Sequence, residues 1–436
     1  MVPRTRSVPL RSTATFSLAA VLALLVLAAT LGGSVGPAAG ARPAADVSVT
    51  PLGLSRDAGL AKPPKPVVLV SPKPQKNANF GYSVAISGAT AVVGAAEATV
   101  KSVDAGRAFI FNTANGSAIN LTSPNSQAQS QGYFGYSVAV SGSTVAVGAP
   151  YESVKTGMGS DTYAGHVYLF SATTGKLTRT LKAPITQDDQ VFGTSVAIHG
   201  TTLVVGMPGT SSGGEALVFN SKTGSLISTL DNPNAPNTSE FGEVVAINGS
   251  TVVVGAPYVD VSGVVEAGSA YTFSASTGTL IGSFVSPTPQ TGGNFGASVA
   301  ISATRVVVGA PGETDSQGYV AGFAYTFGLT SGKLISTLSN PIQSAGGKFG
   351  ISVGINATTV VVGAWDETEK GVFESGGAFT FKAVNGKLAS TLRSTHSFSG
   401  GGFGWSTAIS GHSIVVGAPY ETSKGRVGAG NVYLFG

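Results

Sequence analysis

FGYSVAVSGSTVAVGAP, residues 134–150, is the clearest copy of a unit that recurs along the chain. Each copy begins with Phe-Gly and reaches a Gly-Ala-Pro-like step about a dozen residues later. The Phe-Gly pairs start at Phe80, Phe134, Phe192, Phe241, Phe295, Phe349 and Phe403, so neighbouring copies lie 54, 58, 49, 54, 54 and 54 residues apart. A repeat of this length indicates an array of similar structural units.

The second copy predicts four short β-strands. Ser137–Val140 and Thr144–Gly148 flank a Ser-Gly-Ser turn. His166–Phe170 follows a loop, and a Thr-Gly hairpin turn leads into Lys176–Leu181. The second strand is apolar at successive positions in most copies, as in Val252–Val254, which is typical of a strand covered on both faces. Four strands per repeat favour a propeller blade over the much shorter rung of a β-solenoid.

The two ends of the repeat array predict a closed ring. After Phe403 only three strand-like runs follow, whereas other copies continue into a fourth. Residues 66–72, PVVLVSP, precede Phe80 as residues 338–341 precede Phe349, so they fill the position of the missing strand. We therefore predict an all-β, seven-bladed β-propeller of four-stranded antiparallel blades over residues 66–436, in which an N-terminal strand completes the last blade.

The combination of Phe-Gly and Gly-Ala-Pro resembles the FG-GAP repeat of the integrin α-chain head, a seven-bladed propeller with a similarly divided closure. The resemblance implies that Phe and Gly pack blade against blade. It also implies that ligands bind to one loop-bearing face. Three copies depart from the triplet: Gly94-Ala95-Ala96, Gly206-Met207-Pro208 and Gly363-Ala364-Trp365. Integrin-type repeats often carry an Asp-rich calcium loop between the first two strands, but here that connection is short and nearly acid-free, so we expect no cofactor and no inherited calcium site.

The N-terminal region has the pattern of an export signal. Basic residues precede an apolar run, Phe16–Leu31, and the small-residue site Ala39-Gly40-Ala41 follows, so residues 1–41 are predicted to be a secretory signal peptide. The run is shorter than the roughly 20 apolar residues of a membrane span. Residues 42–65 are predicted to be a Pro/Ala-rich linker. We expect a secreted or cell-surface protein of a bacterial host, with a membrane contact only if the signal is retained as an anchor.

Composition excludes several classes of protein. The formal net charge is +4, but the basic excess lies before residue 66, and the repeat region is close to neutral, so nucleic acid is not an expected partner. The chain has no cysteine, which excludes disulfides, thiolate metal sites and a cysteine nucleophile.

No catalytic or metal-binding constellation stands out. Gly350–Gly354 matches Gly-x-Ser-x-Gly, but Ser352 opens a strand, whereas a nucleophile elbow needs a strand-turn-helix context. Its equivalents in five other blades are Ser83, Ser137, Ser195, Ser298 and Ser406. We expect these hydroxyls to bond nearby backbone. The four histidines show no metal-ligand spacing.

The candidate binding residues lie on one face of the predicted ring, which we call the loop face: the second-to-third-strand loops and the interblade loops. They are Tyr151, Tyr258, Trp365, Asp366, Glu367 and Tyr420. Acidic residues concentrate on this face. Exposed aromatic rings favour contacts with protein or carbohydrate, although such rings can also cover the rim between blades. For the acidic run that begins at Asp366, a solvated loop is the favoured interpretation.

These observations predict a non-catalytic binding, adhesion or scaffold propeller, monomeric, that presents an acidic and aromatic loop face to an extracellular protein or glycan. Two alternatives remain at this stage. One is an extracellular enzyme, polysaccharide-active or quinone-dependent, with its site at the propeller axis. The other is a purely structural envelope or matrix component. A cluster of carboxylates or histidines at the axis would favour the enzyme.

Overall fold

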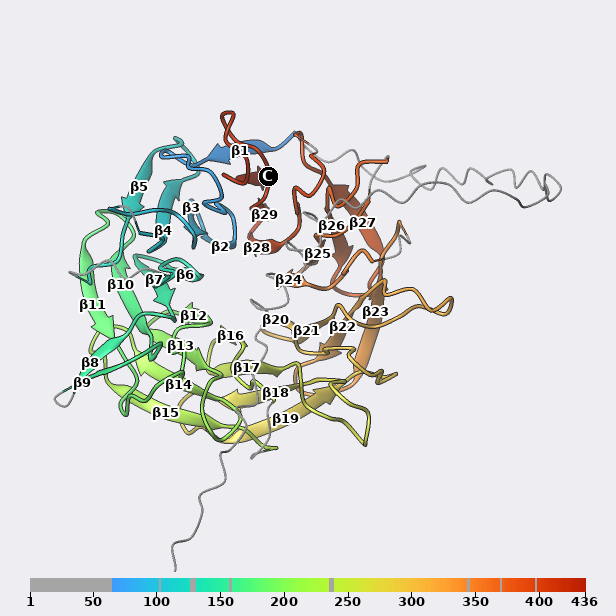
Figure 1. Cartoon of the computed structure of the whole chain (residues 1–436). Coiled ribbons are helices and arrows are strands. Elements are labelled where there is room, and N and C mark those ends of the chain that lie inside the picture. The colour runs from blue at the N-terminus through green and yellow to red at the C-terminus, as the bar shows by residue number, and fades with distance from the viewer. Residues whose placement is uncertain are drawn as a thin grey trace, which may run out of the picture. The chain divides into compact units, whose positions relative to one another are not determined.

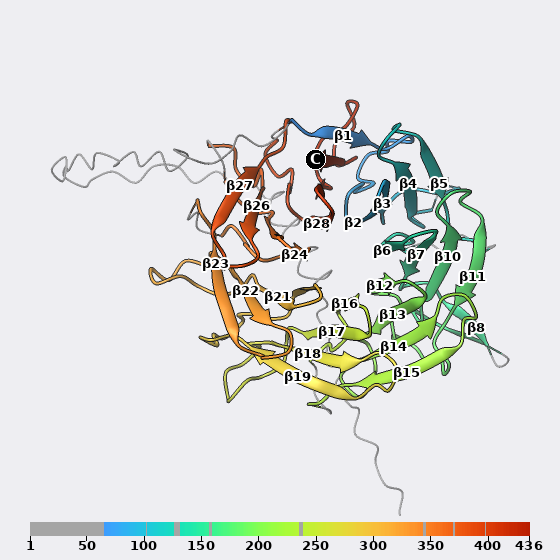
Figure 2. The same cartoon turned by 180° about the vertical axis from the view of Figure 1, so that it is seen from behind.

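The computed structural model describes residues 65–101, 103–125, 131–156, 159–234, 239–342, 346–368, 371–396 and 398–436. These residues form seven four-stranded antiparallel sheets, arranged as blades around a central axis, and one two-stranded hairpin (Figures 1 and 2). The fold prediction is therefore confirmed. The predicted signal peptide, residues 1–41, and linker residues 42–64 lie outside the described residues. In the part that is described, no helix has the length and apolarity needed to cross a membrane.

Within each blade the four strands are ordered from the axis outward. The first strands are β2 (Ser83–Ser87), β6 (Ser137–Ser141), β12 (Val196–His199), β16 (Val244–Asn248), β20 (Ser298–Ile301), β24 (Ser352–Ile355) and β28 (Ser406–Ser410). The second strands are β3 (Thr90–Ala95), β7 (Thr144–Ala149), β13 (Thr202–Met207), β17 (Thr251–Ala256), β21 (Arg305–Ala310), β25 (Thr359–Ala364) and β29 (Ser413–Ala418). The third strands are β4 (Arg107–Asn112), β10 (His166–Ser171), β14 (Glu215–Asn220), β18 (Ser269–Ser274), β22 (Phe323–Gly328), β26 (Gly377–Lys382) and β30 (Asn431–Phe435). The outer strands are β5 (Ala118–Leu121), β11 (Leu177–Leu181), β15 (Leu226–Asp231), β19 (Leu280–Val285), β23 (Leu334–Ser339), β27 (Leu388–Leu392) and β1 (Val67–Val70). The hairpin of β8 (Val154–Thr156) and β9 (Gly159–Asp161) lies in the loop between β7 and β10.

The seventh blade is built from both ends of the described chain. Its strand order is β1-β30-β29-β28, and β1 pairs antiparallel with β30 from Val67↔Leu434 to Val70↔Asn431. Figure 1 shows β1, in blue, beside the red C-terminal strands. Leu69 is buried in a cluster that includes Phe80 and Phe109 of the first blade. The N-terminal strand therefore both completes the seventh blade and joins it to the first.

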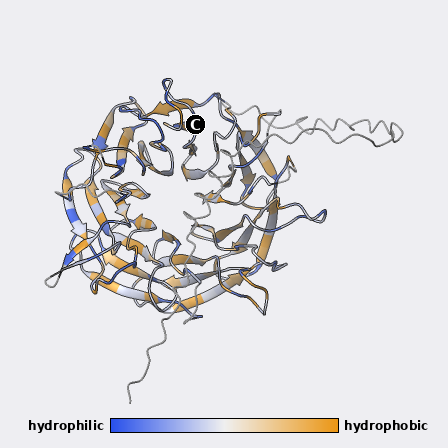
Figure 3. Cartoon of the chain, viewed as in Figure 1, coloured by the Kyte–Doolittle hydropathy of each residue, from blue (hydrophilic) through white to orange (hydrophobic). Residues whose placement is uncertain are grey.

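The core consists of the interfaces between neighbouring blades. Hydrophobic residues are concentrated on the strands (Figure 3). In β17 the side chains of Val252, Val253 and Val254 are all fully buried, which confirms that the second strand is covered on both faces. One cluster joins Val92 of the first blade to Val145 of the second, and similar clusters lie between the other blades. Each blade thus depends on its neighbours for burial of its apolar faces.

The Phe-Gly pair packs one blade against the next, as the family resemblance implied, and the Gly-Ala-Pro step does the same. All seven Phe-Gly phenylalanines are fully buried. Gly135 has φ +91, and a Cβ there would lie 2.2 Å from the carbonyl oxygen of Arg107 in the preceding blade. A Cβ on Gly148 would lie 2.1 Å from the carbonyl oxygen of Gly193 in the following blade. Glycine is required at both positions because backbone approaches backbone there.

The six strand-opening serines form hydrogen bonds between blades. Ser137 Oγ donates to the carbonyl oxygen of Gly193 at 2.8 Å, and Ser406 Oγ donates to that of Gly81 at 2.8 Å across the closure of the ring. The same bond is made by Ser83, Ser195, Ser298 and Ser352. The expectation that these hydroxyls bond backbone is correct, but the backbone belongs to the next blade and is not nearby in the sequence. The Gly-x-Ser-x-Gly match is part of this frame.

Candidate functional site

The residue after each Phe-Gly pair lies where the innermost strand of its blade begins. The first strands of the seven blades encircle the axis (Figure 1). Since these residues precede those strands, we infer that they surround the end of the axis on the loop face, which we call the axial mouth. In chain order they are Tyr82, Tyr136, Thr194, Glu243, Ala297, Ile351 and Trp405. The mouth is therefore aromatic on the side of the seventh, first and second blades and carries a glutamate in the fourth.

Aromatic rings touch one another continuously from the sixth blade to the second. Trp405 lies 5.4 Å from Trp365 and 5.5 Å from both Tyr420 and Tyr82, measured between ring centroids. Tyr82 lies 5.2 Å from Tyr136. Tyr151 extends the contacts on the second blade, at 6.0 Å from Tyr136, 5.3 Å from Tyr133 and 5.8 Å from Tyr163. We call these eight rings the aromatic arc: Tyr82, Tyr133, Tyr136, Tyr151, Tyr163, Trp365, Trp405 and Tyr420.

Glu243 of the fourth blade lies near the arc, since its charge contributes, after burial, to the raised pKa of Tyr82 and Tyr136, and Glu240 lies near Glu243. Burial raises the pKa of Glu243 well above its usual value, and the negative charge of Glu240 adds to this rise. Burial also raises the pKa of Glu240, and the negative charge of Glu266 adds to this rise. After burial, the charges of Glu243 and Glu240 also raise the pKa of Tyr258. Half-buried carboxyls and phenols therefore share the mouth of the axis.

The predicted binding residues divide into three groups. Tyr151, Trp365 and Tyr420 belong to the aromatic arc. Tyr258 lies on the fourth blade, near Glu243 and Glu240. Asp366 and Glu367 are adjacent in sequence but differ in exposure. Asp366 is half-buried on the loop face, where burial and the charge of Glu374 raise its pKa to about 6. Glu367 is completely buried.

Glu367 lies below the surface because it occupies a repeated structural position. Four blades have a buried glutamate four residues after the Gly of the Gly-Ala-Pro step: Glu152, Glu313, Glu367 and Glu421. In three of them a tyrosine of the third strand donates its hydroxyl to this carboxylate, as Tyr168 does to Glu152 at 2.5 Å. In the sixth blade Phe379 replaces that tyrosine, and Asn340 donates to Glu367. The expectation of a solvated loop is therefore wrong for Glu367.

The surroundings of Glu152 do not form a catalytic triad. Ser123 Oγ donates to Glu152 Oε1 at 2.5 Å, and His166 Nδ1 lies 3.1 Å from Glu152 Oε2. The carboxylate thus stands between serine and histidine, whereas a nucleophilic serine needs the imidazole beside its hydroxyl. Among the described residues, no three His, Asp or Glu side chains converge as potential metal ligands.

Sequence reasoning missed Tyr82, Tyr136, Glu243 and Trp405. A signal was present, because the residue after Phe-Gly varies from blade to blade while the pair before it never changes. Within an internal repeat, invariant positions hold the frame, and a varying position beside them is free to serve binding.

The raised carboxyl pKa values predict a stability that falls as pH rises. In the unfolded chain these groups ionise near pH 4, about their reference values. The folded state holds their protons more tightly, so its stability is greatest below those values and is lost as pH rises through the folded pKa values of Asp366, Glu240 and Glu243. We expect a lower melting temperature at about pH 8 than at about pH 5. Glu243→Gln should reduce that difference, whereas the exposed-site control Asp231→Asn should not; a melting temperature that rises with pH would contradict the assignment.

Comparison with known proteins assigns the repeat. The family model described as FG-GAP repeat matches residues 68–111, 122–170, 233–273, 285–327 and 398–435. These matches cover the inner three strands of the first, second, fourth, fifth and seventh blades. The third and sixth blades, which it does not match, are those ending their second strand with Gly206-Met207-Pro208 and Gly363-Ala364-Trp365. No curated protein matches the chain at a significant level.

Proposed function

Because this chain carries FG-GAP repeats in a seven-bladed β-propeller, a fold often used for binding, we propose that it is an exported, non-catalytic binding protein. The aromatic arc at the axial mouth is its contact surface for an extracellular protein or glycan. Export is supported by the signal-like sequence of residues 1–41. The function lies in the irregular loop face, since the repeat itself serves packing between blades.

The single observation that carries this proposal is the continuity of the arc over four blades. Its rings are half-buried or exposed, so each still offers area to a ligand. Aromatic side chains bury much area with little loss of conformational entropy, which is why they dominate binding surfaces.

Trp405 is the test residue, because its ring contacts three other rings of the arc. We expect the purified chain to bind a ligand in a screen of glycans and surface proteins, with and without chelator. Trp405→Ala should weaken that binding by at least about tenfold, as at interface positions that cost more than 1 kcal/mol. Phe373→Ala removes another aromatic ring, which is 62% exposed in a loop of the sixth blade and lies outside the arc, and should leave binding unchanged. Equal effects of the two variants would contradict the proposal.

Glu240 and Glu243 favour a second candidate, a polysaccharide-cleaving enzyme. Their raised pKa values at the axial mouth resemble what a carboxyl general acid requires. The test is release of reducing ends from the polysaccharides that the chain binds. An enzyme should lose this release in Glu243→Gln while keeping its binding, whereas a binding protein should release none in either form.

A further inference from the structure

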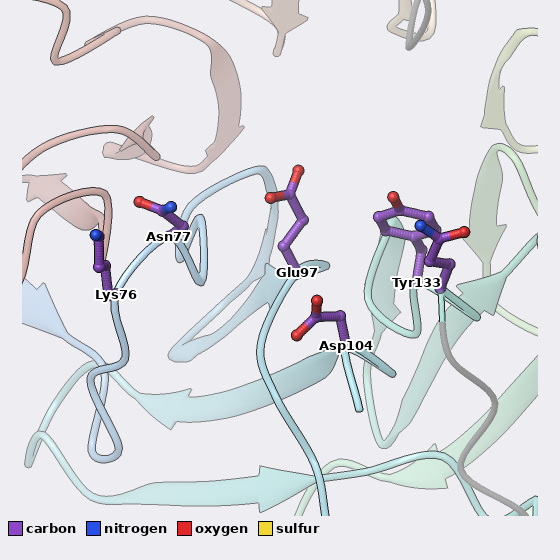
Figure 4. A pocket seen from close by; sticks show the side chains of 6 residues that line it. Lys76, Asn77, Glu97, Asp104 and Tyr133 are labelled. Carbon is purple, nitrogen blue, oxygen red and sulfur yellow. The ribbon is translucent and has the colours of Figure 1, made fainter. Parts of the chain in front are cut away.

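A pocket of about 260 Å³ opens on the loop face where the first blade meets its two neighbours. Three segments contribute to it: the one before β2, the loop between β3 and β4, and the one before β6. Its lining residues are Lys76, Asn77, Glu97, Asp104, Gln131 and Tyr133. Figure 4 shows the two carboxylates in the middle, with Lys76 and Asn77 on one side and the ring of Tyr133 on the other.

Hydrogen bonds hold the walls of this pocket in place. The backbone N–H of Gln131 donates a hydrogen bond to the backbone carbonyl oxygen of Asp104 at 2.9 Å. Thr99 Oγ1 donates to Asp104 Oδ1 at 3.0 Å, which orients that carboxylate. Gln75 bonds both backbone groups of Thr99, at 2.8 and 3.0 Å, and so ties the segment before β2 to the loop after β3. A site whose groups are fixed before binding loses less entropy when a ligand enters.

The lining chemistry fits a neutral sugar better than an ion. Glu97 and Asp104 accept hydrogen bonds, Lys76 donates them, and the amides of Asn77 and Gln131 do both. Sugar hydroxyls likewise donate and accept, and the C–H face of a pyranose ring packs on an aromatic ring such as Tyr133. The two carboxylates repel an anionic ligand, and Lys76 offsets one of their two charges, which weakens the attraction for a cation. The volume is below the roughly 300–1,000 Å³ of sites for drug-sized ligands, so it suits about one sugar unit.

The pocket borders the aromatic arc. Tyr133 lines the pocket and lies 5.3 Å from Tyr151 in the arc. After burial, the charge of Glu97 raises the pKa of Tyr133, and it contributes in the same direction for Tyr420 and Tyr82, which places this carboxylate near all three phenols. We infer that the pocket is a sugar subsite, which holds one neutral pyranose unit of a glycan whose next units lie along the aromatic arc. This inference rests on the proposed function and specifies its ligand class.

Calorimetry on the full chain tests the subsite. The probes are neutral hexasaccharides of glucose, mannose, galactose and N-acetylglucosamine, with hexagalacturonate as the anionic counterpart. At least one neutral probe should bind, and hexagalacturonate should bind at least about tenfold more weakly than that probe because Glu97 and Asp104 repel its carboxylates. Glu97→Gln and Asp104→Asn should each weaken the neutral probe about tenfold, as expected for hydrogen bonds to charged groups. Tyr133→Ala should do the same through the lost ring contact.

Matched controls separate the subsite from general effects on the fold. Asp231→Asn changes an exposed acid, and Tyr319→Ala removes a tyrosine that is 52% exposed in a loop of the fifth blade. Both should bind the probe as the parent does. Glu97 is itself exposed, so Glu97→Gln remains informative even if Tyr133→Ala lowers the melting temperature.

The possible failures are distinguishable. Binding of a neutral probe that is unchanged in all three pocket variants overturns the subsite. Binding of proteins but of no saccharide, lost in Trp405→Ala, also overturns the subsite and leaves the proposed function standing. Saccharide binding that is lost in the pocket variants but not in Trp405→Ala supports the subsite and overturns the role of the arc.

Discussion

Deletion of residues 66–72 is expected to lower the free energy of unfolding by at least about 4 kcal/mol, since loss of one buried leucine alone costs about 2–5 kcal/mol. The deletion removes β1, and with it the pairing partners of residues 431–434 in β30. It also removes Leu69 from the cluster that joins the seventh blade to the first. Because β1 supplies both the outer strand of the seventh blade and a buried contact between the seventh and first blades, we expect a large fall in melting temperature, measured by circular dichroism or calorimetry.

Single substitutions in β1 give the control for this deletion. Leu69 is 6% exposed and Val67 is 59% exposed, although they are two residues apart on the same strand. Leu69→Ser should therefore reproduce much of the loss, by about 2–4 kcal/mol, whereas Val67→Ser should cost less than about 1 kcal/mol. A deletion that melts at the same temperature as the parent would show that β1 does not close the ring.

Gly148→Ala is expected to destabilise the fold by more than about 3 kcal/mol, at the large end of single-residue effects. The added methyl would lie 2.1 Å from the carbonyl oxygen of Gly193 and 2.3 Å from Ser137 Oγ. It would force the second and third blades apart and disturb the hydrogen bond from Ser137 to Gly193, which is 2.8 Å long. Chemical denaturation of the variant against the parent measures this loss.

Gly142→Ala is the matched control in the same blade. Gly142 has φ +53 in the turn between β6 and β7, and a Cβ there meets nothing within 4 Å. The cost should be that of the left-handed backbone conformation alone, about 1 kcal/mol. If the two alanine variants were equally stable, contact between blades would not be the reason for glycine in the Gly-Ala-Pro step.

Much of the fold could be predicted because its signals are local and repeated seven times. The apolar run of Val252–Val254 predicts a strand buried on both faces from its own residues. The match between residues 66–72 and residues 338–341 predicts the divided closing blade, since equivalent sequence fills equivalent positions in a repeat.

The candidate site could be predicted only in part. Tyr151, Trp365 and Tyr420 were found because aromatic residues beside the Gly-Ala-Pro step are conspicuous. Glu367 was misplaced because burial of a carboxylate depends on a partner, Asn340, that lies 27 residues away. No local pattern shows that such a partner will be present.

By itself the sequence determined the number of blades, the four strands of each and the order of closure. These features follow from short-range periodicity and from a motif that recurs at a nearly constant spacing. Only the tertiary structure decided which variable residues meet. Tyr82 and Trp405 are more than 300 positions apart and yet have ring centroids 5.5 Å apart, and Glu97 joins Tyr133 in one pocket. Residues of different blades become neighbours only when the ring closes, because the curvature that brings them together belongs to the packed blades and to no single one of them.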